Sequence, residues 1–311
     1  MTRRPVLIVG GIVVLLAVLA IVFIFLYSRP QGTGSGRRLL VIGAENEYAN
    51  VLAQIGGRYV QAVGIMANPN TDPHTFEAST VDASLVAKAA LVVQNGLGYD
   101  GFMQNLEGAS PNPRRIVVTA AQVVGAPPAS PNPHLWYRPN TMPKVAARIA
   151  QALGSLDPAH RSYYQRNLAA FDRSLRPWQA ALRRLGTAAR GKSALVTEPV
   201  ADYLLQAAGV GIATPWTFQA AVMNGQDPSP QDVATMDRLL RQHKVSVLVY
   251  NYQAVDATTA SLLSLARQHG VPVVGVYETM PQGYDYQRWM LAETDGLYTA
   301  IMQGRSEVLA P

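Results

Sequence analysis

Short runs of apolar residues alternate along most of the chain with segments whose apolar residues recur at helical spacing. Runs of this kind are typical of parallel strands that are buried on both faces. In the first half, strands are expected at Leu39–Ala44, Tyr59–Met66, Ala90–Gln94 and Ile116–Val118. In the second half, they are expected at Ala194–Thr197, Val245–Tyr250 and Pro272–Tyr277. The alternation predicts an α/β fold with two lobes, each a parallel β-sheet flanked by helices.

Serine residues mark where one helix of each half should begin. Ser79 precedes a segment with an Ala, Val and Leu face, and serine is a favoured N-cap residue. Ser229 is followed by Pro230, whose fixed φ suits the first helical position. In sheets of this kind, ligands bind beyond the carboxyl ends of the strands. Functional side chains are therefore expected in the loops that follow the strands.

The segment between the halves predicts one long backbone helix. Asp157–Leu185 contains no glycine, and Pro177 is its one interior proline. At 1.5 Å per residue such a helix is about 40 Å long, with an expected kink at Pro177. The predicted boundaries are therefore 39–155 for the first lobe, 156–187 for the connecting helix and 188–311 for the second lobe.

The N-terminus carries an uncharged apolar run, Pro5–Tyr27, directly after Arg3 and Arg4. A membrane-spanning helix needs about 20 apolar residues, whereas the apolar core of a signal peptide has about 7–15. Residues 1–28 are therefore interpreted as a transmembrane anchor, with an unusually long signal peptide as the alternative. The two arginines favour an N-terminus inside the cell and the rest of the chain outside it. Residues 29–38, rich in Gly and Ser, predict a flexible tether.

Composition excludes several kinds of site. The chain has no cysteine, which excludes disulfides, thiolate metal ligands and a lipidated cysteine anchor. The formal net charge of +6 comes mainly from scattered arginines, which indicates a solvated surface and no nucleic-acid partner. No phosphate-binding loop is present, so any ATPase must be a separate subunit. A metal site in this chain would have to use His, carboxylates or amides.

Four candidate ligands follow predicted strands. His74 and His134 each come directly after a proline, which restricts the loop and preorganises the imidazole. Glu198 and Glu278 stand at the ends of strands in the second half. Two imidazoles and two carboxylates suit a hard-to-borderline divalent ion. On residue type alone, each His could equally be a capping or surface group.

These residues lie in motifs that resemble the substrate-binding proteins of zinc and manganese ABC importers. The resemblance runs from Leu39 to Gln303. Its motifs are DPHTFEAS at Asp72–Ser79, QNGLGYD at Gln94–Asp100, NPHLWY at Asn132–Tyr137, TEPVADYL at Thr197–Leu204, AVMNGQDPS at Ala221–Ser229, YNYQ at Tyr250–Gln253 and ETMPQG at Glu278–Gly283. The pair of motifs around the two histidines, in this order, is the most specific part of the match.

The resemblance implies a ligand set and an architecture. It makes His74 and His134 the first two metal ligands and places the third on Glu198. The fourth, usually Asp in the family, falls on Glu278, with Glu45 after the first strand as a rival. It also implies a chelatase-like fold of two lobes joined by a backbone helix. Two features depart from the family: 123–133 holds no His-rich loop, and an apolar segment stands in place of a lipidated cysteine.

We therefore predict a monomeric, extracytoplasmic binding protein, not an enzyme. It captures Zn²⁺ or Mn²⁺ between its lobes as the transported ligand and delivers it to an ABC permease with a cytoplasmic ATPase. Two alternatives are a zinc-dependent hydrolase with an open coordination position, and a metal chaperone or adhesin without an importer. The chain has no HExxH motif, which disfavours the hydrolase. Two nitrogens and two carboxylates accept either metal, so the residue types do not distinguish Zn²⁺ from Mn²⁺.

Overall fold

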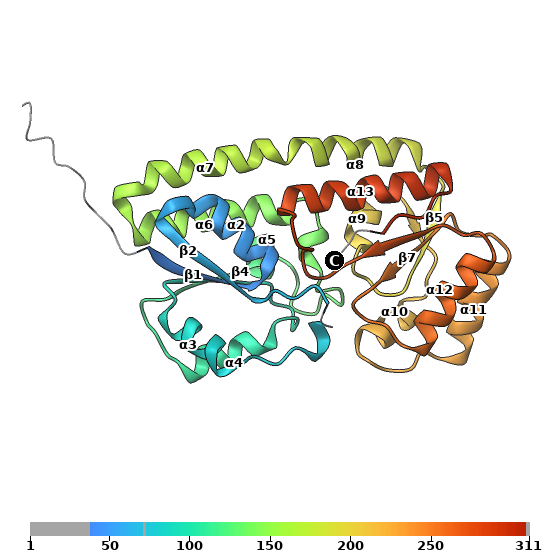
Figure 1. Ribbon diagram of the computed structural model, residues 1–311, viewed down its shortest axis with the longest axis horizontal. Coiled ribbons are helices and arrows are strands. Elements are labelled where there is room, and N and C mark those ends of the chain that lie inside the picture. The colour runs from blue at the N-terminus through green and yellow to red at the C-terminus, as the bar shows by residue number, and fades with distance from the viewer. Residues whose placement is uncertain (1–37, 71–72, 309–311) are drawn as a thin grey trace, which may run out of the picture. The chain divides into compact units, whose positions relative to one another are not determined.

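The computed structural model describes residues 38–70 and 73–308 (Figure 1). The predicted anchor at 1–28, and all but the last residue of the predicted tether at 29–38, lie outside these residues. Among the helices that the structure does describe, none combines the length and the apolar character needed to cross a membrane.

The first lobe is built on a sheet of parallel strands in the order β2-β1-β3-β4. The strands are β1 (Leu39–Glu45), β2 (Val60–Met66), β3 (Leu91–Gln94) and β4 (Ile116–Thr119). One face carries α2 (Asn46–Gly56), α5 (Ala120–Val124) and α6 (Thr141–Leu156). The other carries α3 (Thr80–Lys88) and α4 (Gly101–Ala109) (Figure 1). Helices on both faces explain why the strand sequences are apolar throughout rather than alternating.

Adjacent residues of the central strands belong to different hydrophobic layers. Val41 and Val93 pack with the layer that contains α2 and α6. Ile42 and Val92, one position away in each strand, pack with the layer that contains α3 and α4. Successive side chains of a strand point to opposite faces, so each apolar run supplies residues to both layers.

The second lobe repeats this arrangement in the order β6-β5-β7-β8, again all parallel. Its strands are β5 (Ser193–Val196), β6 (Gly211–Ile212), β7 (Val247–Asn251) and β8 (Val273–Val276). One face carries α10 (Trp216–Met223), α11 (Pro230–Arg241) and α12 (Ala257–Gln268), and the other carries α9 (Asp202–Ala207) and α13 (Tyr286–Gln303). Strand β6 was not predicted, because a two-residue edge strand produces no apolar run.

The predicted helix starts are confirmed. Ser79 caps α3 in a capping box, in which its side chain accepts from the backbone of Asp82 and the Asp82 carboxylate accepts from Ser79 in return. Ser229 caps α11, and Pro230 is the first residue of that helix. Caps of this kind stabilise a helix by about 1 kcal/mol, because they satisfy backbone N–H groups that have no partner inside the helix.

The predicted single backbone helix is wrong in one respect, because two helices follow one another here (Figure 1). A short 3₁₀ turn leads into α7 (Arg161–Ser174), and α8 (Arg176–Ala188) begins after an interruption at Leu175. Pro177 stands in the first turn of α8. Because proline lacks an N–H and its ring would collide with the carbonyl of Arg173, a continuous helix is broken before the proline rather than kinked at it.

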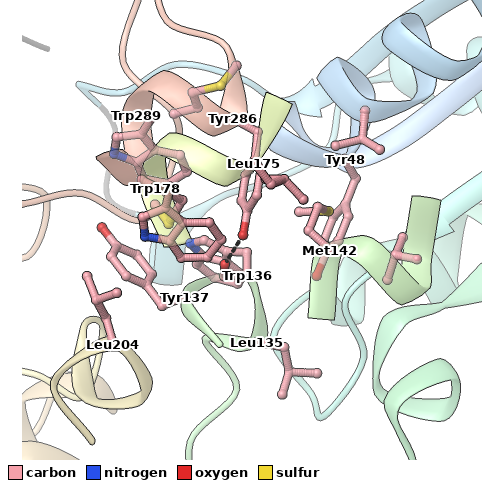
Figure 2. Close-up of a cluster of buried hydrophobic side chains, with 14 of the residues drawn as sticks. Tyr48, Leu135, Trp136, Tyr137, Met142, Leu175, Trp178, Leu204, Tyr286 and Trp289 are labelled. Atoms are coloured by element: carbon pink, nitrogen blue, oxygen red, sulfur yellow. Dashed lines mark hydrogen bonds between the residues drawn. The ribbon is translucent and has the colours of Figure 1, made fainter. Parts of the chain in front are cut away.

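One hydrophobic core continues from the first lobe into the second. Figure 2 shows Trp136 of the first lobe among Trp178 of α8 and the α13 residues Tyr286 and Trp289, all fully or almost fully buried. The Tyr286 hydroxyl donates to the Trp136 carbonyl at 2.6 Å, and Trp178 Nε1 donates to Thr294 Oγ1 at 3.0 Å. The lobes are thus joined by packed aromatic side chains as well as by helices. The lobe boundaries given above stay a prediction.

Candidate metal centre

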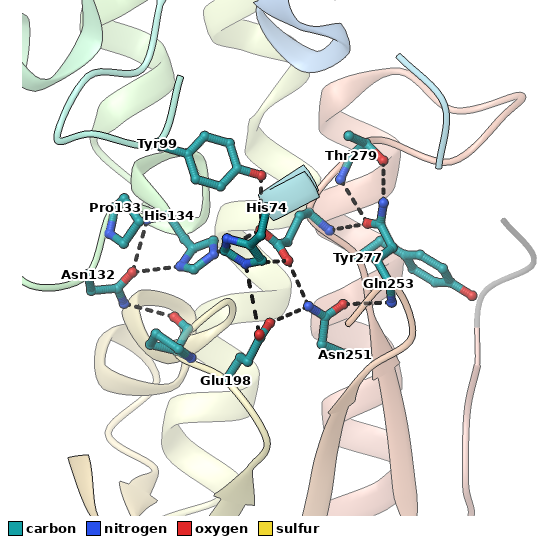
Figure 3. Close-up of polar contacts among 12 residues, drawn as sticks. His74, Tyr99, Asn132, Pro133, His134, Glu198, Asn251, Gln253, Tyr277 and Thr279 are labelled. Atoms are coloured by element: carbon teal, nitrogen blue, oxygen red, sulfur yellow. Dashed lines mark hydrogen bonds and ion pairs between the residues drawn. The ribbon is translucent and has the colours of Figure 1, made fainter. Parts of the chain in front are cut away.

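Four polar side chains converge where the carboxyl ends of the two sheets face each other. His74 follows β2 in the short 3₁₀ turn η2 (Pro73–Thr75), and His134 lies in the loop after α5. Glu198 and Glu278 each stand two residues beyond the end of a strand, β5 and β8 respectively. Figure 3 shows the imidazoles of His74 and His134 side by side, with His74 joined by a dashed line to the Glu198 carboxylate of the second lobe.

The distances between these groups are those expected around a small cation. His134 Nε2 lies 3.2 Å from Glu278 Oε2, and His74 Nε2 lies 3.5 Å from Glu278 Oε1. His74 Nε2 is also 3.8 Å from Glu198 Oε1. Donor atoms about 2.1 Å from a tetrahedral ion are about 3.4 Å apart. His74, His134 and Glu278 form a potential metal-binding group whose donor atoms lie within 4.8 Å of one another.

Asn132 fixes the orientation of the His134 ring. Its Oδ1 accepts the His134 backbone N–H at 2.9 Å and faces ring Nδ1 at 2.8 Å, while its Nδ2 donates to the Pro199 carbonyl at 2.8 Å. Because Oδ1 must be the acceptor, the hydrogen-bond network assigns the ring hydrogen to Nδ1. A neutral ring therefore carries its lone pair on Nε2, the nitrogen nearest the Glu278 carboxylate, as in metal-ligating histidines.

The protonation states match what a metal ion requires. Burial lowers the pKa of His134, an effect that the neighbouring Glu278 only partly opposes. Burial alone would raise the pKa of Glu278, but the two imidazoles outweigh it and hold that pKa below its usual range. The two imidazoles lower the pKa of Glu278 only while they donate a proton to its carboxylate, so the metal-free site holds a proton between His134 Nε2 and Glu278. A metal ion can take the place of that proton and bind both atoms.

The two carboxylates share one amide donor. Asn251 Nδ2 donates to Glu278 Oε1 at 2.7 Å and also to Glu198 Oε2. Gln253 supports the same loop, because its Oε1 accepts the backbone N–H groups of Glu278 at 2.6 Å and Thr279 at 3.0 Å (Figure 3). The sequence analysis assigned no role to either amide, although both lie in the YNYQ motif that carries part of the family resemblance.

His74 is the most accessible of the four candidate ligands. Its side chain is 23% exposed, whereas those of His134, Glu198 and Glu278 are fully buried. It borders a cavity of about 680 Å³ that is also lined by Tyr99 and Trp216. An ion that enters from solvent therefore meets His74 first.

Glu45 is not part of the converging group. The group of His74, His134 and Glu278 does not include Glu45, which is fully buried, with no hydrogen-bond partner for its carboxyl oxygens among the described residues. Glu198 also lies outside that group, but its Oε1 approaches His74 Nε2 at 3.8 Å. The pKa of Glu45 is raised well above its usual range, mainly by burial and also by the nearby Asp100 and Glu47. A neutral carboxyl group is a poor metal ligand, so the geometry favours Glu278, and the choice between the two stays a prediction.

The chain is similar to known metal-transport proteins over most of its length. The family model described as "Zinc-uptake complex component A periplasmic" matches residues 41–300. The metal ABC transporter substrate-binding lipoprotein FimA of Streptococcus parasanguinis is 24% identical over 260 residues, 79% of this chain and 82% of that protein. The manganese ABC transporter substrate-binding lipoprotein PsaA of Streptococcus pneumoniae is 23% identical over 252 residues, 76% of this chain and 80% of that protein.

Solved structures confirm the predicted two-lobed fold. The periplasmic zinc binding protein TroA from Treponema pallidum superposes with a TM-score of 0.72 at 18% identity, covering 86% of this chain and 100% of that chain. The protein FpvC from Pseudomonas aeruginosa, solved in complex with Mn²⁺, superposes with a TM-score of 0.71 at 24% identity, covering 86% and 99%. Because the family model spans well over half of its residues, the chain belongs to the zinc-uptake complex component A family of metal-binding substrate-binding proteins of ABC importers.

Proposed function

We propose that this chain is the extracytoplasmic protein that captures one divalent transition-metal ion and delivers it to an ABC permease with a separate ATPase. The proposed ligands are His74, His134, Glu198 and Glu278. The observation that carries the proposal is the approach of both imidazoles to one buried carboxylate, with His134 Nε2 3.2 Å from Glu278 Oε2 and His74 Nε2 3.5 Å from Glu278 Oε1. A divalent cation that replaces the protons between these atoms is bound by all of them at once.

The ligand count supports binding rather than hydrolysis. Catalytic zinc sites keep a coordination position open for water beside three protein ligands, whereas closed sites hold the ion with four. Here two nitrogens and two carboxylates converge, and three of the four side chains are fully buried. Such a site holds an ion and leaves little space for a water nucleophile and a substrate.

The cellular setting is part of the same proposal. The apolar segment at 5–27 anchors the chain, so that the metal-binding lobes work outside the cytoplasm as a monomer beside the permease. A shortened chain that starts at Gly36 should be soluble, while the full-length chain should fractionate with membranes at its full mass. Mature protein that begins after Tyr27 and is free in the supernatant would overturn the anchor, but not the metal site.

The metal site is tested by thermal unfolding after treatment with a chelator. A ligand at about 100 times its Kd stabilises the native state by about 2.7 kcal/mol, which is an increase of about 5–10 °C in Tm for a chain of this size. We expect this increase with Zn²⁺ or Mn²⁺ for the parent and for a matched control, His269→Ala, which removes a histidine at the end of α12. His134→Ala should lose it. An increase in Tm that survives in His134→Ala would show that the metal binds elsewhere.

A further inference from the structure

Strand order brings one amide between the two proposed carboxylate ligands. Strand β7 lies between β5 and β8, and Asn251 is its last residue. In the register of the sheet, Val196 is paired with Val249, and Asn251 is paired with Val276. Glu198 and Glu278, each two residues beyond its strand, therefore flank Asn251 on either side.

The Asn251 side chain can present only its N–H groups to the site. Its Oδ1 accepts the Gln253 backbone N–H at 3.0 Å, which assigns the nitrogen to the opposite side. Its own backbone N–H donates to Thr197 Oγ1 at 3.0 Å, and the residue is 1% exposed. A group fixed in this way acts on the ion through the carboxylates and not as a ligand itself.

The amide divides the carboxylate oxygens into two sets. Glu198 Oε2 and Glu278 Oε1 accept from Asn251 Nδ2. The other oxygens face the imidazoles, with Glu198 Oε1 3.8 Å from His74 Nε2 and Glu278 Oε2 3.2 Å from His134 Nε2. Glu278 Oε1 also lies 3.5 Å from His74 Nε2, but it is the oxygen that the amide holds. The amide therefore fixes how each carboxylate is turned. Glu198 has one oxygen, Oε1, on the side of His74, whereas both oxygens of Glu278 lie on the side of the imidazoles, with Oε2 the nearer.

We propose that Asn251 determines metal specificity, because it fixes the rotation of both carboxylates and holds Glu198 to the use of one oxygen. With the two imidazole nitrogens and the nearer oxygen of Glu278 this makes a four-donor site, the coordination number that Zn²⁺ adopts in closed sites. Mn²⁺ favours more oxygen donors in an octahedral arrangement, which carboxylates that bind through both oxygens would supply. The inference rests on the proposed function. It adds that the orientation of the carboxylates lowers the affinity for Mn²⁺ further than the general preference of these ligand types for Zn²⁺ would.

The test compares the affinities of Zn²⁺ and Mn²⁺ for the same variants, by competition with a chromophoric chelator. Asn251→Ala releases both carboxylates, so the ratio of Kd for Mn²⁺ to Kd for Zn²⁺ should fall by at least about tenfold, the size expected for groups that orient metal ligands. Asn251→Ser keeps one donor and can hold one carboxylate at a time, so its ratio should be intermediate. It also serves as the test variant if Asn251→Ala does not fold.

Asn46→Ala is the matched control. Asn46 Nδ2 donates to the Met280 carbonyl at 2.7 Å, and the Met280 N–H donates to Asn46 Oδ1 at 2.8 Å. These two hydrogen bonds join the lobes close to the site, because Met280 is two residues after Glu278. Among the described residues, Asn46 makes no hydrogen bond to either carboxylate ligand. Its loss should lower Tm and leave the ratio of the two Kd values within about twofold of the parent, a change smaller than that of a single average hydrogen bond.

The outcomes separate the inference from the function on which it rests. A parent protein that binds neither metal overturns the proposed function. A parent that binds metal while Asn251→Ala and Asn251→Ser keep its ratio overturns the specificity role alone. An equal change of the ratio in Asn46→Ala also overturns it, because loosening of the lobes would then be sufficient. X-ray absorption at zinc should show a coordination number of four in the parent and a higher one in Asn251→Ala.

Discussion

Glu278 and Glu293 are both buried carboxyl groups near the junction of the lobes, yet their surroundings leave the first ionised and the second neutral at neutral pH. Glu278 faces two imidazoles, which lower its pKa below the usual range. Glu293, on α13, is 1% exposed, and burial raises its pKa to about 8, although Trp289 and the hydroxyl of Tyr137 donate to its Oε1. Glu293 is therefore a neutral structural group and Glu278 a charged ligand candidate.

The comparison teaches that whether a buried carboxyl group is ionised depends on its partners rather than on its burial. Glu45 and Glu47 are as buried as Glu278, and burial is the largest cause of the raised pKa of each. Neither of them faces an imidazole in the converging group. Desolvation acts on all of these carboxyl groups, and only a positive or proton-sharing neighbour reverses it.

The largest expected effect separates the two candidates for the fourth ligand. Glu278→Gln removes the charge opposite His134 and should weaken zinc binding by about hundredfold or more, roughly 2.7 kcal/mol. Glu45→Gln replaces a neutral carboxyl group with a neutral amide and should leave the affinity within about twofold. Isothermal titration of both variants after chelator treatment checks this pair. Equal losses of affinity in both would return Glu45 to the ligand set.

A second prediction concerns the stability of the metal-free protein. Because the pKa of Glu293 is raised to about 8, its contribution to stability is fully present below the unfolded value near 4.3 and is lost as pH rises towards 8. That loss is at most about 1.4 kcal/mol per pH unit. Asp202, whose pKa burial raises to about 7, adds a loss of the same sign. Urea unfolding at intervals from pH 5 to 9 should show stability falling, and falling less steeply in Glu293→Gln.

The metal site should respond to pH in the opposite sense. Protonated imidazole cannot ligate, so zinc affinity should fall as pH decreases below the ordinary His pKa of about 6.5. Burial lowers the pKa of His134, so this imidazole becomes protonated and stops ligating only at a lower pH. Affinity should then decrease by about tenfold per pH unit for each imidazole that must lose a proton. An affinity that does not change between pH 7 and 5 would exclude histidine ligands.

The smallest expected effect concerns the hydroxyl of Tyr99, which donates to Glu278 Oε2 at 2.9 Å. Tyr99→Phe removes one hydrogen bond to a charged group and keeps the ring. A bond of this type contributes about 1.5–3 kcal/mol when it is lost without replacement, and less where the ion takes over the oxygen. A decrease in zinc affinity of about threefold to tenfold is expected by titration. A loss as large as that of Glu278→Gln would show that the Glu278 carboxylate cannot bind the ion unless Tyr99 holds it in place.

The strands could be predicted from the sequence because their signals are local, since apolar runs reveal strands buried on both faces. The two histidines were assigned through motifs that resemble a known family, because residue type alone left each of them open to a capping or surface role. The fourth ligand was assigned to Glu278 with Glu45 as a rival, because both follow strands and differ only in what lies across the site from them. Asn251 and Gln253 were missed for the same reason, since an amide becomes informative only when its partners are known.

The break between α7 and α8 could be predicted only in part. Pro177 indicated a disturbance, but the position of the interruption at Leu175 depends on which carbonyl the proline ring would meet in a continuous helix. Strand β6 could not be predicted at all, for a different reason. Its two residues pair with β5 through backbone hydrogen bonds at the edge of an existing sheet, and such pairing needs no side-chain pattern.

The aromatic core shared by the lobes also sets how quickly cargo can leave. Separating the lobes would expose Trp136, Trp178, Tyr286 and Trp289 to water together, and each large aromatic side chain costs about 2–3 kcal/mol to expose. Moving the short turn that carries His74 exposes far less apolar surface. An ion held at the proposed site would therefore leave by a local motion of this turn at a lower cost in free energy than by separation of the lobes. A permease that contacts this turn could speed release without separating the lobes.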